Sequence, residues 1–146
     1  MKIVNVEEFS VAGVHVRTKN ADEMNGESAK IGGLWQKFGV SVAPKLTNDS
    51  IIYGVYCHYE SDANGEFDVY AGSNALSDSD GLGSVTVATG EYMVFSQKGE
   101  MPLAVINAWV KIWQYFSESP ERERAYTTDF ECYKSDDEVE VYIALK

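Results

Sequence analysis

LWQKF at residues 34–38 and AWVKI at residues 108–112 decide the fold of this chain. Each stretch places one tryptophan among apolar residues with the spacing of an amphipathic helix, and a shift of 74 residues carries Trp35 onto Trp109. Two hairpin turns follow the two helices and come into register under the same shift. Agreement in order, spacing and helix signature is typical of an internal repeat. The sequence therefore predicts a chain built from two related units.

Each unit is expected to run strand, helix, strand, strand, over about residues 10–76 and 85–146. The strand segments are rich in β-branched and aromatic residues, and Asn64-Gly65 predicts a tight hairpin turn. Strands are expected over 2–9, 11–17, 51–60, 67–72, 85–97, 126–133 and 139–145, and helices through 31–38 and 103–116. We therefore expect a single α+β domain over residues 1–146, in which antiparallel sheets and two main helices surround a central cleft.

Composition excludes several classes of function. The chain carries 12 Lys plus Arg against 23 Asp plus Glu, so its formal net charge is −11. Such a surface repels phosphates, which argues against a nucleic-acid or anionic-membrane partner. No apolar run reaches the roughly 18 residues that span a bilayer, and the start has no signal-peptide core, so we expect a soluble cytoplasmic protein. Two cysteines and two histidines form no local zinc motif, and we expect neither a metal nor another cofactor.

Two strand segments, 126–133 and 139–145, close the chain, and side-chain alternation gives each of them two faces. Glu131 and Tyr133 share one face of the first strand, and Tyr142 lies on the corresponding face of the second. We expect the apolar positions of the other faces to pack against the helices, which leaves these three side chains together on the opposite face. That face is either a solvated sheet surface or the lining of a cleft between the two units.

The cleft interpretation gathers aromatic side chains around the Glu131 carboxylate. The 74-residue shift places Cys57 and Tyr59 opposite Glu131 and Tyr133. The tryptophans of the two quoted stretches lie on helical stripes and are assigned to the core, whereas a third is assigned to the cleft edge. The candidate ligand-binding residues are Glu131, Tyr133, Tyr142, Tyr59, Tyr53, Cys57, Phe95 and Trp113.

A carboxylate among aromatic rings selects positively charged ligands. Nine tyrosines and three tryptophans supply rings with an apolar body and a polar tip. Each cation–π contact contributes about 0.5–2 kcal/mol, and burial of an apolar skeleton adds about 25 cal/mol per Å². Desolvation raises the pKa of a buried carboxylate, so a weakly hydrated cation neutralises it at low cost. Such a site would discriminate strongly by charge and loosely by shape.

Five stretches, in the same order along the chain, resemble those of a known family: Gly33-Leu34-Trp35 through Phe38, Ile52-Tyr53-Gly54-Val55, Ala88-Thr89-Gly90-Glu91-Tyr92-Met93-Val94-Phe95, Trp109, and Asp129-Phe130-Glu131-Cys132-Tyr133. The chain resembles the GyrI-like small-molecule-binding domain, also called the AraC-type effector-binding domain. It is most similar to the free-standing form carried on mobile integron gene cassettes. The resemblance implies two units around a pseudo-twofold axis and an aromatic pocket whose buried glutamate pairs with lipophilic cations. Glu131 stands at that position.

We therefore expect a binding module for cationic, lipophilic, aromatic, drug-like molecules rather than an enzyme. Cys57 and His58 are neighbours in a strand and are expected to point to opposite faces, and no nucleophile–base–orienter triad can be assembled, so no catalytic residue is assigned. Two alternatives remain. Glu131 could activate water in a small-molecule hydrolase, or the acidic surface could serve an inhibitor or protein-interaction module. The sequence fits a monomer or a homodimer equally.

Overall fold

A single antiparallel sheet with helices on one face forms the molecule. The computed structural model describes residues 2–77, 81–118 and 121–146. Within them the strands are β1 (Lys2–Val6), β2 (Phe9–Thr18), β3 (Ile52–Cys57), β4 (Phe67–Ser73), β5 (Gly83–Val87), β6 (Gly90–Lys98), β7 (Thr128–Ser135) and β8 (Glu138–Ala144). The helices are α1 (Asn20–Glu23), α2 (Ile31–Ser41), α3 (Leu103–Ser117) and a 3-10 turn, η1 (Ala43–Lys45). The α+β prediction is confirmed.

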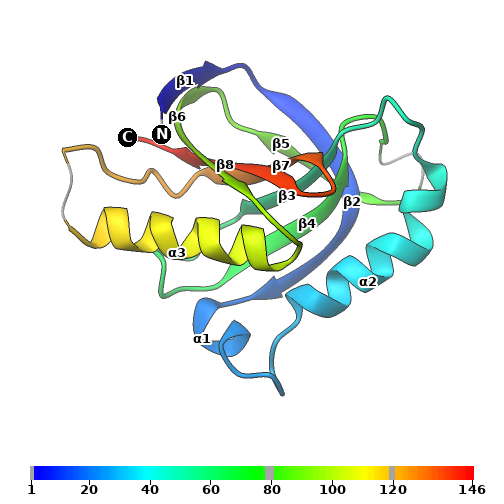
Figure 1. Cartoon of the computed structure of the whole chain (residues 1–146), viewed down its shortest axis with the longest axis horizontal. Helices are drawn as coiled ribbons and strands as arrows, with labels where there is room; N and C mark the ends of the chain where they lie inside the picture. The colour runs from blue at the N-terminus through cyan, green and yellow to red at the C-terminus, as the bar shows by residue number, and fades with distance from the viewer. Residues whose placement is uncertain (1, 78–80, 119–120) are drawn as a thin grey trace.

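The strand order is symmetric about the centre of the sheet. It reads β1-β6-β8-β7-β3-β4-β2-β5, and every neighbouring pair is antiparallel. The second strand of each hairpin, β4 or β8, lies next outward from the central β3–β7 pair. Beyond it lies the strand that precedes the helix of the same unit, β2 or β6. The sheet is curled, so that β1, β2 and β5 arch away from its centre (Figure 1).

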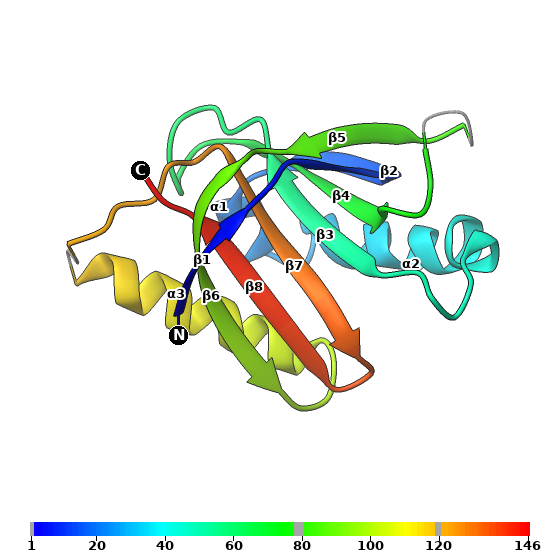
Figure 2. The same ribbon diagram turned by 90° about the horizontal axis from the view of Figure 1, so that it is seen from above.

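Helices α2 and α3 cover the two ends of one face. α3 packs on β6 and β8, and α2 packs on β2 and β4. Seen from above, β3 and β7 run between the two helices (Figure 2). We call the face that carries α2 and α3 the helix face. Its central strip, over β3 and β7, is where side chains of both helices converge.

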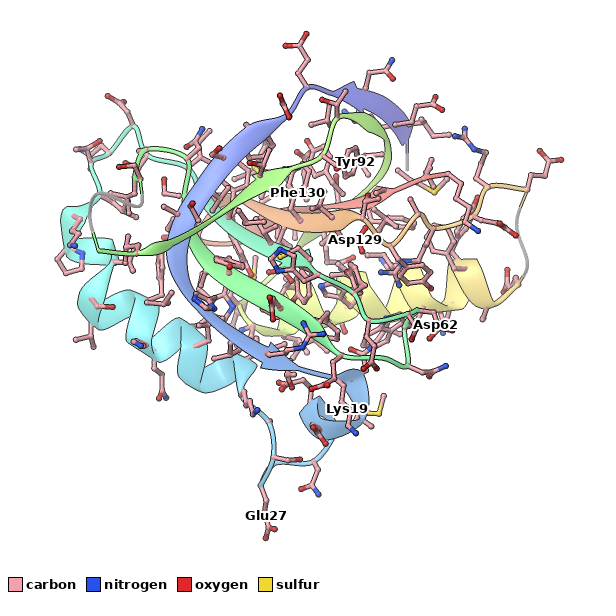
Figure 3. All side chains as sticks on the ribbon, turned by 180° about the vertical axis from the view of Figure 1, so that it is seen from behind. Lys19, Glu27, Asp62, Tyr92, Asp129 and Phe130 are labelled. Atoms are coloured by element: carbon pink, nitrogen blue, oxygen red, sulfur yellow. The ribbon has the colours of Figure 1, made fainter. Side chains whose placement is uncertain are left out.

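The opposite face of the sheet is also buried. Tyr53, Tyr92 and Phe130 belong to one apolar cluster on that face, and Phe9 packs against it. The rings of Tyr92 and Phe130 lie 5.4 Å apart, beneath the arch of the outer strands (Figure 3). The sheet therefore has two apolar sides, since its own curled strands cover the side that lacks helices.

The 74-residue shift holds for the helices but not for the strands. Leu34 and Phe38 are buried in α2, and Ala108 and Ile112 are buried at the matching positions of α3. In the strands the same shift equates Tyr56, which lies on the helix face, with a residue on the opposite face. That residue is Phe130, and the predicted match of Cys57 with Glu131 fails in the same way, because Cys57 lies on the opposite face. The number of residues between helix and strand differs by an odd number between the two units, and side chains in a strand alternate between its two faces.

Candidate functional site

A buried carboxylate stands at the centre of the helix face. Glu131 lies in β7, paired with Gly54 of β3 and Val141 of β8, and it is only 2% exposed. The position is the central strip between α2 and α3. The alternative of a solvated glutamate on an open sheet surface is therefore wrong.

Three neutral groups donate hydrogen bonds to this carboxylate. Tyr56 Oη and Trp109 Nε1 donate to Oε2 at 2.7 and 2.8 Å, and Tyr133 Oη donates to Oε1 at 2.9 Å. Burial raises the pKa of Glu131, and the three hydrogen bonds partly oppose that rise. Burial, together with the Glu131 charge, also holds the pKa of Tyr56 well above its usual value, so this tyrosine stays a donor.

Gly54 makes room for the carboxylate. A Cβ at this position would lie 2.6 Å from Glu131 Oε1 and 3.1 Å from Cζ2 of Trp35. The Trp35 ring in turn meets the Tyr133 ring edge-on at 5.3 Å. Two of the three donors act on Oε2, so Oε1 keeps more capacity to accept hydrogen bonds. Oε1 and the Trp35 ring both border the space next to the Gly54 Cα.

The two helices each contribute a tryptophan to this site. Trp35 comes from α2, and Trp109 from α3 packs against Tyr56 with ring centroids 4.9 Å apart. Trp113, one turn further along α3, lies 6.1 Å from Trp109 and is 37% exposed. We call these rings the aromatic cluster: Trp35, Tyr56, Trp109, Trp113 and Tyr133. It leads from the buried carboxylate to solvent.

The structure brings together only part of the predicted set. Glu131 and Tyr133 are hydrogen-bonded to each other, and Trp113 reaches them through Trp109. Tyr142, Tyr53 and Cys57 lie on the opposite face, in or against the same apolar cluster as Phe130. The prediction that Tyr142 shares a face with Glu131 is wrong, because the register sets Tyr142 opposite Phe130, with the two rings stacked at 4.4 Å.

The physical reason is that both faces of the sheet are buried. The expectation that apolar positions face the helices assumes that the other face is polar and solvated. Here the apolar residues of β7 fill the side beneath the curled strands, and those of β8 fill the helix face. Cys57 also lies on the face opposite Glu131 for this reason. A second reason is that the strands of the two units are related by an odd shift, whereas the predicted shift of 74 residues is even.

Tyr59 serves a second buried carboxylate. Asp129, two residues before Glu131, accepts hydrogen bonds from Tyr59 Oη at 2.5 Å, from Arg124 Nη2 at 2.7 Å and from the Ala144 amide at 2.9 Å. Both members of the Arg124–Asp129 ion pair are buried. Asp129 is thus neutralised within the fold and ties the segment before β7 to β8, whereas the donors to Glu131 carry no charge.

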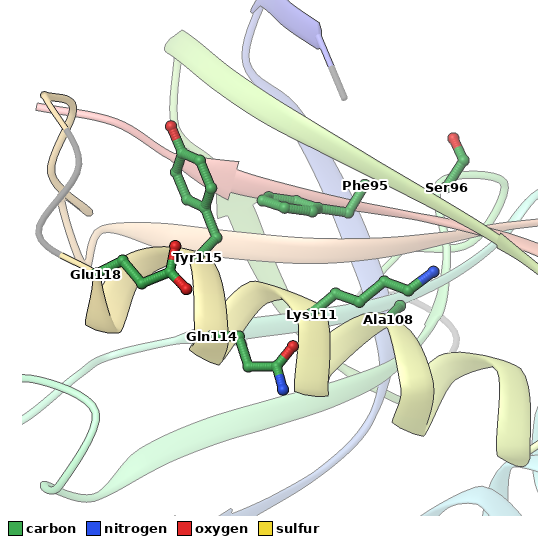
Figure 4. Close-up of a pocket in the computed structure, with 7 residues that line it drawn as sticks. All are labelled: Phe95, Ser96, Ala108, Lys111, Gln114, Tyr115 and Glu118. Carbon is green, nitrogen blue, oxygen red and sulfur yellow. The ribbon is translucent and has the colours of Figure 1, made fainter.

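Phe95 lies on the helix face but lines a different hollow. The hollow measures about 480 Å³ and lies between β6 and the flank of α3, with Lys111, Tyr115 and Glu118 around it (Figure 4). Glu131 is not among its lining residues. Among the described residues that line it, the charged side chains are exposed, so the hollow has no buried charge to select a ligand.

Trp35, Trp109 and Tyr56 are the site residues that sequence reasoning misses. The apolar stripe of its helix assigns Trp109 to the core, and periodicity does not indicate where an indole N–H points. Tyr56 stands one residue before Cys57 and therefore lies on the other face of the strand, so alternation indicates it as soon as Cys57 is placed away from Glu131. A register that pairs Gly54 with Glu131 would place Tyr56 on the face of Glu131, but it would not place Trp109.

Cys57 and His58 do not point apart, contrary to the alternation argument. His58 has a φ of 52°, which ends β3 and turns its ring back, so that Nδ1 lies 3.6 Å from Cys57 Sγ and 2.6 Å from Asp68 Oδ2. Alternation holds only for extended backbone. Burial and the nearby Asp68 charge raise the pKa of Cys57 to about 12, so the thiol is protonated near neutral pH.

Comparison with known proteins assigns the family. Residues 2–145 match the model of the family described as integron-associated effector binding protein, and the chain belongs to this family. The integron cassette protein VCH_CASS2 of Vibrio cholerae is 49% identical, and its crystal structure superposes with a TM-score of 0.94 over 99% of this chain and 95% of that one. The predicted resemblance to the GyrI-like effector-binding domain, and to integron cassette proteins in particular, is confirmed.

More distant relatives match over nearly the whole chain. YobU of Bacillus subtilis (strain 168) is 27% identical over 92% of this chain and 91% of its own length. The structure of SAV2435 bound to tetraphenylphosphonium is 18% identical, with a TM-score of 0.69 over 99% of this chain and 93% of that one. Among the described residues, no helix is both long and apolar enough to cross a membrane.

Proposed function

We propose that this protein binds lipophilic aromatic cations at Glu131, between α2 and α3. The observation that carries the proposal is a carboxylate that is 2% exposed, accepts three hydrogen bonds from neutral donors and is surrounded by the aromatic cluster. Membership of an effector-binding family supports small-molecule binding, as does the structural relative SAV2435 with its bound organic cation.

Charge selection follows from the burial of Glu131. A buried carboxylate loses its hydration, and the neutral donors replace only part of it, which is why its pKa is raised. A weakly hydrated cation restores the lost electrostatic stabilisation and gains cation–π contacts of about 0.5–2 kcal/mol with each ring that it meets. An anion in the same place would meet the carboxylate in a medium of low dielectric constant.

A ligand reaches the carboxylate by moving aromatic rings. Oε1 accepts one hydrogen bond and Oε2 accepts two. A Cβ built on Gly54 would lie 2.6 Å from Oε1 and 3.1 Å from the Trp35 ring, so the oxygen and the ring border the same small space. Displacement of Trp35 therefore uncovers the less occupied oxygen. The exposed edge of Trp113 marks the solvent side of this route.

A calorimetric comparison of three ligands of similar shape tests the proposal. Tetraphenylphosphonium is a cation, tetraphenylborate an anion, and triphenylphosphine oxide a neutral analogue. We expect binding of the cation alone, and we expect Glu131→Gln to weaken it by about 2–5 kcal/mol, because that variant removes one member of a buried charge pair.

Glu140→Gln is the matched control. Glu140 lies in β8, is half-buried and accepts a hydrogen bond from Tyr142 at 3.0 Å, but it is on the opposite face. This variant should bind the cation as the unmodified protein does. Equal binding of cation and anion, or equal loss in both variants, contradicts the proposal. The same proteins should not turn over ester substrates, and hydrolysis that disappears in Glu131→Gln would favour a hydrolase instead.

A further inference from the structure

Three donor atoms of different chemistry meet at the end of β3, away from Glu131. Cys57 Sγ, His58 Nδ1 and a carboxylate oxygen of Asp68 all lie within 4.8 Å of one another. Cys57 and Asp68 are direct partners across the β3–β4 pair, and the turn at His58 returns its ring to them. Cys57 belongs to the face opposite the aromatic cluster, so this group is separate from the proposed ligand site.

The contacts of this group differ from those of a catalytic triad. A triad uses the two nitrogens of one imidazole, one toward the nucleophile and the other toward the carboxylate. Here the same nitrogen, His58 Nδ1, faces both Cys57 Sγ at 3.6 Å and Asp68 Oδ2 at 2.6 Å. The three atoms lie within 4.8 Å of one another, which is close enough for them to bind one metal ion together.

We propose that Cys57, His58 and Asp68 bind a divalent transition-metal ion of the zinc class. Tetrahedral zinc with Zn–S near 2.3 Å and Zn–N near 2.05 Å sets sulfur and nitrogen about 3.6 Å apart. The Cys57–His58 distance is already 3.6 Å. The His58–Asp68 distance of 2.6 Å must widen to about 3.3 Å. The His58 side chain is 57% exposed, so it is free to make this small rotation.

Metal binding requires two proton movements and brings two anionic ligands to the ion. The ion displaces the thiol proton of Cys57 to solvent, and the His58 proton moves to Nε2, so that Nδ1 offers a lone pair. Thiolate and carboxylate then bring two negative charges to the divalent ion, and water from the open side completes four ligands. Arg17 also forms an ion pair with Asp68, so the group as a whole carries one positive charge, which lies on the exposed Arg17 side chain. Arg17 Nη1 holds Asp68 Oδ1 at 3.1 Å and the His58 carbonyl at 3.1 Å, which fixes both residues while Oδ2 remains available to the metal.

Titration of the reduced protein with Co²⁺ tests this proposal. A thiolate bound to Co²⁺ gives a charge-transfer absorption in the near ultraviolet, and four-coordinate geometry gives strong visible bands. We expect both signals to saturate at one equivalent and Zn²⁺ to abolish them by competition. Cys57→Ser should remove the charge-transfer absorption, whereas Cys132→Ser should retain it, because Cys132 is also a buried cysteine but lies outside the group.

His58→Asn provides a second variant that keeps the fold. Asn tolerates the positive φ of this exposed position but cannot place a nitrogen where Nδ1 lies. We expect at least tenfold weaker Co²⁺ binding, since even outer-shell partners of metal sites are worth about 10–100-fold. Absence of the charge-transfer absorption, its survival in Cys57→Ser, or unchanged affinity in His58→Asn would each overturn the proposal.

Discussion

Replacement of Gly54 by alanine tests whether the Glu131 carboxylate is held as tightly as the structure shows. The new Cβ would lie 2.6 Å from Oε1, whereas ordinary contact begins near 3.4 Å, so the carboxylate must retreat by about 0.8 Å. A retreat of that size lengthens at least one of its hydrogen bonds, now 2.7–2.9 Å, beyond the usual hydrogen-bonding distance.

The expected cost combines two effects. Loss of one hydrogen bond to a charged group costs about 1.5–3 kcal/mol, and overpacking costs about 1–3 kcal/mol. Against these, alanine restricts the unfolded chain and gains about 0.4–1 kcal/mol. Together these terms predict that Gly54→Ala lowers the free energy of unfolding by about 1.5–5.5 kcal/mol, measured by urea denaturation near neutral pH.

Gly39→Ala is the control for this measurement. A Cβ at Gly39 in α2 would meet nothing within 4 Å, so alanine should stabilise the protein there by about 0.5–1 kcal/mol through helix propensity. The two Gly→Ala changes thus have opposite expected signs. A Gly54→Ala variant as stable as the unmodified protein would show that the carboxylate is free to move and would refute the reasoning.

Three further changes probe the buried charges. The folded-state pKa of Glu131 is raised, so the stability that its protonated form contributes is lost as pH rises from near 4 through that pKa. Across this range Glu131→Gln should therefore become more stable relative to the unmodified protein. A constant difference between the two proteins in urea titrations would contradict this. Trp109→Phe removes the N–H that donates to Glu131 at 2.8 Å and should lower the free energy of unfolding by about 1.5–3 kcal/mol near neutral pH. The loss should be smaller in acid, where Glu131 is protonated. Equal losses at both pH values would contradict an ionised Glu131. Asp129→Asn leaves Arg124 buried without its counter-charge and should cost about 3–5 kcal/mol in thermal or urea unfolding, and a cost below about 1 kcal/mol would deny the ion pair this role.

The order of the elements could be predicted from the sequence because helix stripes and strand composition are local signals. The 74-residue match between Trp35 and Trp109 correctly equates the buried positions of α2 and α3. The strand faces could not be predicted in this way. Alternation identifies two faces but does not say which one meets the helices when curled strands bury the other, and this is why it places Tyr142 and Tyr53 on the wrong side.

Two features of the candidate site depend on single-residue detail. A shift of one residue in register exchanges every side chain of a strand between faces, so the repeat selects Cys57 in place of Tyr56. The meeting of His58 with Asp68 depends on one positive φ, which no periodicity encodes. Glu131 could be identified because the resemblance to a family points to its position, and the structure adds Trp109 and Tyr56 as its partners.

Proton release on ligand binding tests the role of Glu131 most directly. A cation beside the carboxylate lowers its raised pKa, so binding must expel protons in the pH range where Glu131 titrates. Calorimetry with tetraphenylphosphonium in buffers of different ionisation enthalpy, from about pH 4.5 to 7.5, measures the number of protons released for each ligand bound. The account predicts release by the unmodified protein that falls to zero as pH rises, and none by Glu131→Gln. Binding without proton release, or the same release in both proteins, would contradict it.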